Sequence, residues 1–285
     1  MKHFLLLIAF ASLYTVVLFP FTSYMKSRPV VEKIGYIPDP AAMKLLSADQ
    51  HQLAAASLVW NVISYYGGLM EQAKSREQFR PEFPAMQKMI ETAAYLDPYN
   101  MDAYYFAQAM VWSTGQVTVT NRLLEYGMRY RTWDYYLPYF AGFNYAYFLK
   151  DYANAARNYR RVGELTGSDL AMTLAGRYLY ESGRTDMAIS YLTLMVKNAG
   201  NDAVKKALET RLNAFLSVRT IEQAVDVFAK KFHRRPKTIE DLMRNKILAE
   251  VPQDPYGGTF YIDEKGKVRS TSKFSFAPVK QRRRA

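Results

Sequence analysis

The residue types that most often carry out chemistry are few and scattered in this chain. It has no cysteine, which excludes thiolate nucleophiles, disulfides and thiolate metal sites. The three histidines, His3, His51 and His233, do not stand at a metal-ligand spacing such as i, i+4 with an acidic partner. No phosphate-binding loop, dinucleotide fingerprint or Gly-x-Ser-x-Gly motif is present. We therefore predict no catalytic residue, no metal site, no cofactor and no small-molecule substrate.

Acidic residues near the C-terminus have structural explanations. Glu240 and Asp241 stand where a helix is predicted to begin, and negative charge there favours the helix dipole. Asp254 and Asp263 are oxygen ligands of the type that calcium prefers. However, Asp254 precedes a proline, and such an aspartate is typically a turn residue that accepts hydrogen bonds from its own backbone. The sequence leaves open whether this turn binds calcium.

The positive charge is concentrated in the last third of the chain. The net charge is +12, and residues 204–285 contain 19 Lys and Arg against 9 Asp and Glu, a difference of +10. A localised basic region attracts nucleic acid or anionic lipid, whereas scattered lysines only keep a protein in solution. The terminal "KQRRRA" is a candidate contact for phosphates or anionic lipid headgroups, although a short basic tail is usually solvated.

An almost unbroken apolar run from Phe4 to Phe21 follows the first three residues. About 18 residues are just enough to cross a bilayer. A secretory signal peptide usually has a shorter apolar core and a small-x-small cleavage site, which the following residues do not supply cleanly. We predict a single-pass, uncleaved anchor over residues 4–21, with a cleaved signal and a buried core helix as the alternatives.

The charges that flank this run nearly balance. Lys2 and the terminal amine precede it, while Lys26, Arg28 and Lys33 follow it. A short basic start followed directly by an apolar run is typical of an export signal. We therefore favour an inner-membrane protein whose body is periplasmic, and the cytoplasmic orientation stays open.

An internal repeat follows the apolar run. Three alanines lie 34 residues apart and are followed by the residues of a small-residue position: Ala107-Gln108, Ala141-Gly142 and Ala175-Gly176. Second helices with an alanine near their start follow, which aligns Ala155 with Ala188, and "AAYLDPYN" ends an earlier unit. This spacing resembles the tetratricopeptide repeat, whose units are antiparallel helix pairs. We predict units at about residues 45–100, 101–134, 135–167 and 168–201.

The resemblance implies an all-α fold in which the helix pairs stack into a right-handed superhelix with a concave groove. The chain departs from the family at its tryptophan position, which holds Tyr104, Pro138 and Met172, and in an inserted loop at about residues 71–82. The family register places twelve residues in the groove: Asp102, Tyr105, Ala109, Trp112, Tyr136, Tyr139, Phe143, Ala146, Leu170, Thr173, Arg177 and Tyr180.

A groove of this composition is aromatic and nearly neutral. It suits a hydrophobic or extended peptide rather than a terminal carboxylate. We therefore predict that a protein or peptide partner is bound by seven of these residues, namely Tyr105, Trp112, Tyr136, Tyr139, Phe143, Arg177 and Tyr180. Tyrosines at helical spacing are also common in packing between helices. For each of these tyrosines, packing between helices is the alternative to contact with a partner.

Beyond residue 202 the 34-residue pattern fades. Apolar spacing predicts one amphipathic helix from Val204 to Leu216 and a second from Ile221 to Phe232. Thr220 with Gln223 is a plausible capping box for the second. A short helix capped by Thr238 follows.

The segment after this short helix predicts a β-hairpin. Phe260 and Ile262 alternate with polar residues, Gly266 closes a turn and Val268 begins the return strand. The stretch "FHRRPKTIEDLMRNKILAEVPQDPYGGTFYIDEKGKV" resembles the tail of type II secretion pseudopilins. The processing motif of that family's amino terminus is absent, so the resemblance implies a folding module and a bacterial envelope location, not a pilin.

These features together predict three regions: an anchor and its flank at 1–30, repeats at 31–201, and C-terminal helices with a hairpin and basic tail at 202–285. The function that they favour is a membrane-anchored scaffold or adaptor in an envelope assembly or secretion system. The alternative is a cytoplasm-facing adaptor whose basic C-terminal module contacts anionic lipid or nucleic acid.

Overall fold

The computed structural model describes residues 2–27, 34–35, 39–73 and 81–274. The terminal "KQRRRA" and most of the predicted loop at 71–82 lie outside these residues. The described chain is mostly helical, as predicted, with one small antiparallel sheet. It divides into two compact units, Met1–Thr132 and Trp133–Ala285.

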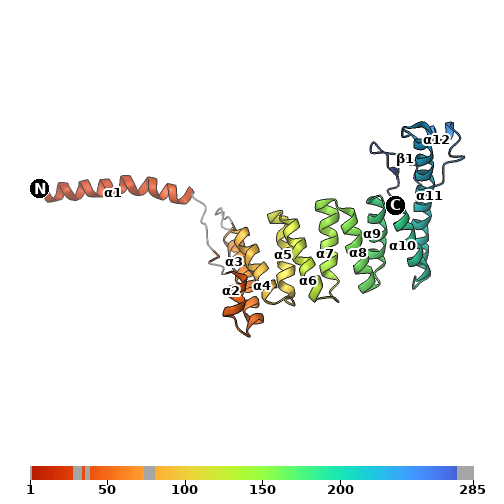
Figure 1. Ribbon diagram of the computed structural model, residues 1–285. Helices are drawn as coiled ribbons and strands as arrows, with labels where there is room; N and C mark the ends of the chain where they lie inside the picture. Colours follow the sequence, from red (N-terminus) through yellow and green to blue (C-terminus); the bar gives the residue numbers. More distant parts are fainter. Residues whose placement is uncertain (1, 28–33, 36–38, 74–80, 275–285) are drawn as a thin grey trace, which may run out of the picture. The chain divides into compact units, whose positions relative to one another are not determined.

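Unit 1 contains only helices among its described residues (Figure 1). They are α1 (Lys2–Ser27), α2 (Pro40–Leu46), α3 (His51–Ala73), α4 (Phe83–Leu96), α5 (Met101–Thr114) and α6 (Val117–Tyr130).

Unit 2 contains helices followed by a two-stranded sheet. They are α7 (Tyr136–Asn144), the π-helix η1 (Tyr145–Leu149), α8 (Tyr152–Thr166), α9 (Asp169–Glu181), α10 (Thr185–Lys197), α11 (Asp202–Phe232), α12 (Ile239–Arg244), β1 (Phe260–Ile262) and β2 (Val268–Ser270).

Helix α1 covers the predicted membrane span at residues 4–21. Apolar side chains on it, such as Phe10 and Phe19, are exposed. Judged by length and composition, one helix in the described part of the chain qualifies as a membrane span, and it is His51–Glu71 within α3. Core helices of soluble proteins and signal sequences have the same length and composition. The N-terminal anchor stays a prediction.

The helices pair in sequence order as the repeat predicts. Within unit 1, α3 packs on α4 and α5 packs on α6, and within unit 2, α7 packs on α8 and α9 packs on α10. Ala107, Ala141 and Ala175 are fully buried where each pair meets. A Cβ atom added to Gly142 would lie 3.1 Å from the ring of Tyr159. The small residue therefore allows the close approach of α7 and α8.

The C-terminal region differs from its prediction in one respect. The two helices predicted at 204–216 and 221–232 form a single helix, α11, of 31 residues. Thr220 is not an N-cap, because its hydroxyl donates back to the carbonyl of Leu216 within the helix. The buried positions Phe215, Val218 and Ile221 follow one another at helical spacing, so the apolar face continues without a break.

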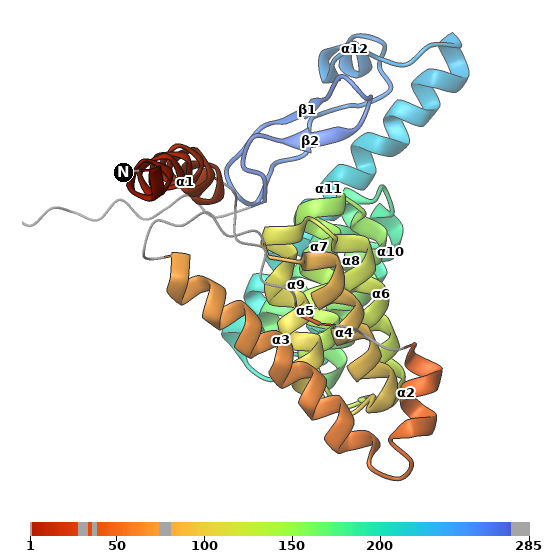
Figure 2. The same cartoon turned by 90° about the vertical axis from the view of Figure 1, so that its left-hand side faces the viewer.

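The predicted hairpin is confirmed. β1 pairs antiparallel with β2, with Ile262 opposite Val268, and Gly266 adopts a positive φ of 74° in the turn. Thr238 caps α12 in a capping box with Asp241. Figure 2 shows the hairpin and α12 beside α11. One hydrophobic core joins α9, α10, α11, α12 and the hairpin, and the boundary predicted at 201/202 falls inside it.

Candidate functional site

The seven predicted binding residues fall on both units, so each unit is described by itself. On α5 of unit 1, Trp112 is 62% exposed and Tyr105 is half-buried. A groove of about 500 Å³ lies between α3 and the start of α5, and its lining includes Trp60 and Asp102 but neither Tyr105 nor Trp112. Of the twelve residues that the family register places in the groove, this lining contains only Asp102.

On unit 2, four of the remaining five residues reach the surface. Tyr136 and Tyr139 are 42% and 38% exposed, Phe143 is half-buried, and Arg177 on α9 is exposed. Tyr180 is different, because only 5% of it is exposed and its hydroxyl donates to the carbonyl of Val268. The prediction that Tyr180 contacts a partner is therefore wrong. The hairpin, distant in sequence, covers it.

Five exposed or half-buried aromatic residues of α7 and η1 form one surface. We call it the α7 aromatic surface, and it consists of Tyr136, Tyr139, Phe140, Phe143 and Tyr147. The rings of Tyr136 and Phe140 lie 6.1 Å apart, and those of Phe143 and Tyr147 stack at 5.3 Å with an angle of 7° between their planes. Residues at i and i+4 share a helix face, which explains both pairs.

The surface continues from α7 into the π-helix η1, where Tyr147 is the surface's last aromatic residue. The α-helical register predicted Ala146 in the groove, but Ala146 is buried and Tyr147 is 52% exposed. The wider turn ends at Lys150, which adopts a left-handed conformation with φ of 54°. Single π turns recur at functional sites because they re-aim side chains. The only signal of Tyr147 in the sequence is its position four residues after Phe143.

A second layer of rings lies beneath the surface and holds it. Tyr139 meets the buried Tyr159 edge to face at 5.9 Å, and Tyr159 stacks on Tyr178 at 5.6 Å. Tyr178 in turn stacks on Tyr152 at 5.8 Å. Burial raises the pKa of Tyr159 and of Tyr178 above the usual value, so both rings stay neutral at physiological pH.

The α7 aromatic surface is also nearly free of charge. Residues 133–149 contain one charged residue, Asp134, which is buried and accepts a hydrogen bond from the backbone of Tyr136. Just beyond this segment, the Nζ of Lys150 lies 5.3 Å from the centre of the Tyr147 ring. Exposed aromatic rings with little charge around them are typical anchors for an apolar partner. Nothing in this geometry supports acid–base or nucleophilic chemistry.

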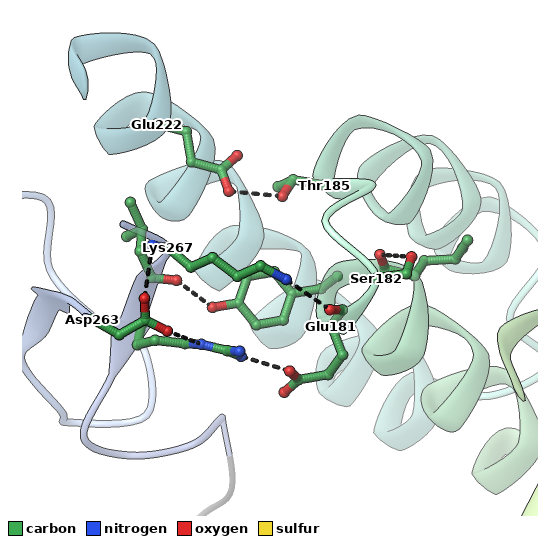
Figure 3. Close-up of polar contacts among 10 residues, drawn as sticks. Glu181, Ser182, Thr185, Glu222, Asp263 and Lys267 are labelled. Carbon is green, nitrogen blue, oxygen red and sulfur yellow. Dashed lines mark hydrogen bonds and ion pairs between the residues drawn. The ribbon is translucent and has the colours of Figure 1, made fainter. Parts of the chain in front are cut away.

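A polar cluster at the end of α9 ties the hairpin to the last helix pair (Figure 3). Arg269 on β2 pairs with Glu181 at 2.5 Å and with Asp263 at 3.3 Å. Lys267 donates to the carbonyl of Glu181, and Thr185 donates to Glu222 at 3.0 Å. Burial raises the pKa of Glu222 above its ordinary value. Each of these carboxylates contacts another part of the chain. The cluster therefore stabilises the packing of the hairpin and α11 on α9 and α10.

The aspartates considered for calcium have other roles. Asp254 is 3% exposed and accepts hydrogen bonds from the hydroxyls of Ser270 and Ser272 and from the backbone of Tyr256. Asp263 accepts from the backbone of the hairpin turn and from Arg269. Within the described ranges no three histidine, cysteine, aspartate or glutamate side chains gather as metal ligands would. Asp254 therefore organises the turn that precedes the hairpin.

Comparison with known proteins adds no assignment: no protein-family model matches the chain, and no curated protein matches it.

Proposed function

We propose that this chain is a membrane-anchored helical-repeat scaffold that binds a protein or peptide partner and catalyses no reaction. The helix pairs would stack as in tetratricopeptide repeats, with their first helices turned to the partner. The observation that carries the proposal is the α7 aromatic surface, which is partly exposed, contains no charged residue of its own and packs on the buried ring of Tyr159.

The partner that this surface fits has apolar or aromatic side chains and little charge. Tyrosine adds a hydroxyl to its ring, so a partner backbone can be hydrogen-bonded while its side chains pack on the rings. An extended segment or the apolar face of a helix meets both requirements. Arg177 lies on the next first helix, α9, and offers a charged contact at the margin.

Support for the location comes from two parts of the chain. Helix α1 exposes apolar side chains along the predicted span, which is what a membrane anchor requires. The hairpin and the turn at Asp254 have the form expected from the resemblance to pseudopilin tails. We therefore place the body of the scaffold in the envelope, outside the cytoplasm.

The binding proposal is tested by photo-cross-linking in the native cell. A photoreactive residue replaces Tyr147, and a control replaces Tyr261, which is 45% exposed on β1 of the same unit. We expect position 147 to capture one defined polypeptide, identified by mass spectrometry, that position 261 does not capture.

A double variant completes this test. Tyr136→Ala with Phe143→Ala should abolish the cross-link from position 147 while the helical circular dichroism signal stays unchanged. Equal capture from 147 and 261, or capture that survives the double variant, would contradict the proposal. Loss of the helical signal would show instead that these rings are core.

A second candidate is the cytoplasm-facing adaptor, and one observation favours it. Around the end of α11, exposed cations outnumber the nearby acids, which are Asp226, Glu240, Asp241, Asp263 and Glu264. These cations are Lys230, Lys231, Arg234, Arg235, Lys237, Arg244 and Lys246. Such a cluster attracts anionic lipid or nucleic acid. A reporter enzyme that works only outside the cytoplasm, fused after Ala285, separates the two: activity supports the envelope, and inactivity with stable expression supports the adaptor.

A further inference from the structure

Helix α3 has two apolar sides, and only one of them is packed. Ala55, Leu58, Val62 and Leu69 are buried where α3 packs on α4 and α5. The exposed side carries what we call the open face of α3, formed by Leu53, Ala56, Trp60, Ile63 and Met70. The uncharged polar residues Ser57, Asn61 and Ser64 are exposed on the same side. A surface helix normally presents polar residues to water, whereas a helix that is apolar all round is normally covered all round.

The open face is unusual because it has no charge. Between Asp49 and Glu71 the sequence contains no Lys, Arg, Asp or Glu, over a helix about 35 Å long at 1.5 Å per residue. Leu53 and Trp60 are 64% and 67% exposed. This is the stretch that meets the length and composition of a membrane span. Since its other side packs on α4 and α5, α3 cannot cross a bilayer without unfolding unit 1.

A helix of this kind suits the surface of a membrane. Interfacial helices lie flat, with one apolar face in the boundary between headgroups and acyl chains. Tryptophan is enriched at that depth because its ring is apolar and its N–H is polar. Trp60 stands at the middle of the open face. The groove beside it is also lined by Asn100 and Asp102 at the start of α5.

The chain also limits how far α3 can be from the membrane. Twelve residues, 28 to 39, separate the end of α1 from the start of α2. Whatever their conformation, they span at most about 45 Å. A bilayer that holds α1 is therefore always within reach of unit 1, at high effective concentration.

We infer that the open face of α3 is a second membrane contact, which holds unit 1 against the bilayer in which α1 is anchored. The inference rests on the proposed anchoring by α1. Because the open face has no cation, the contact depends on burial of apolar surface and not on anionic lipid. It therefore forms on zwitterionic lipid and persists at high salt.

Fluorescence quenching of single tryptophans tests the inference. The full chain is reconstituted into phosphatidylcholine vesicles whose acyl chains carry bromine, which quenches tryptophan at short range. One variant keeps only Trp60 (Trp112→Phe, Trp133→Phe), and the matched control keeps only Trp112 (Trp60→Phe, Trp133→Phe), which is similarly exposed in the same unit. We expect about twofold quenching of Trp60 and little quenching of Trp112, at low and high salt.

Two further measurements make each outcome decisive. Flotation of the vesicles reports anchoring by α1: a chain that does not float contradicts the proposed function. A chain that floats while Trp60 is quenched no more than Trp112 overturns only the inference. Trp60 that is shielded from aqueous iodide but unquenched by bromine is covered by protein, which also overturns it. Leu53→Glu should reduce the quenching of Trp60, whereas Leu170→Glu, similarly exposed on α9, should not.

Discussion

The hydroxyl of Tyr180 on α9 donates a hydrogen bond of 2.5 Å to the backbone carbonyl of Val268 on β2, across 88 residues of sequence. The ring of Tyr180 stacks on Phe215 of α11 with centroids 4.9 Å apart and meets Phe274 edge to face at 5.3 Å. One side chain thus links the last helix pair, the long helix and the hairpin. The C-terminal hairpin is therefore part of the core of unit 2.

Removal of this hydroxyl should loosen the hairpin. Tyr180→Phe keeps the ring contacts but leaves the Val268 carbonyl buried without this donor, which costs about 1–3 kcal/mol. Hydrogen exchange of the hairpin amides should become faster, and the urea midpoint of unit 2 should fall. Tyr261→Phe on the exposed face of β1 is the control and should change neither. Unchanged exchange in Tyr180→Phe would contradict the linking role.

The stability of unit 2 should depend on pH through Glu222. Burial raises its pKa above the ordinary 4.5, so the folded state holds the proton more tightly than the unfolded state. Its contribution to stability is full below the unfolded pKa and declines as the pH rises through the raised folded pKa. In Glu222→Gln this decline should disappear, because the amide oxygen still accepts from Thr185 and does not ionise. Urea unfolding between pH 4 and 8 measures the difference in slope.

The close approach of α7 and α8 should not tolerate a methyl group. Gly142→Ala places a Cβ atom 3.1 Å from the ring of Tyr159, which is held between Tyr139 and Tyr178 and cannot move aside. We expect a loss of about 1–3 kcal/mol from overpacking. Gly67→Ala in α3 is the control, since no atom lies within 4 Å of its added Cβ, and it should gain about 0.5–1 kcal/mol. Chemical denaturation measures the change in the free energy of unfolding of each variant. A gain in stability in both would rule out the tight packing at Gly142.

The sequence predicts that Thr220 and Thr238 both cap helices, but only Thr238 does, because α11 continues through Thr220. Thr238→Ala removes the N-cap of α12 and should cost about 1 kcal/mol. Thr220→Ala lies inside α11 and should be neutral or stabilising by a few tenths of a kcal/mol, because alanine has the higher helix propensity. Thermal unfolding of the two variants makes the comparison. A cost of about 1 kcal/mol for Thr220→Ala would restore the two-helix prediction.

Local patterns determined much of the secondary structure. Apolar spacing predicted the helices after residue 202, and the alternation of Phe260 and Ile262 predicted the hairpin. The helix pairs were implied by the resemblance that the 34-residue spacing of Ala107, Ala141 and Ala175 carries. These features are readable because helix and strand periodicities depend only on neighbouring residues. The break predicted near Thr220 failed for the same reason: a capping pattern is local, whereas one apolar face from Phe215 through Ile221 packs in a single core and keeps the helix intact.

At the candidate site, local sequence patterns predict which residues share a helix face but not which of them are buried. The sequence by itself determined that aromatic residues recur on the first helices of the repeat, and Tyr136, Tyr139 and Phe143 do lie together on α7. Only the tertiary structure decided that Tyr180 is buried, because a hairpin 88 residues later covers it. It also decided that Ala146, which the family register places in the groove, is buried while Tyr147 is exposed. Periodicity places side chains on a face, but which face is covered depends on segments that are distant in the sequence and meet only in the folded chain.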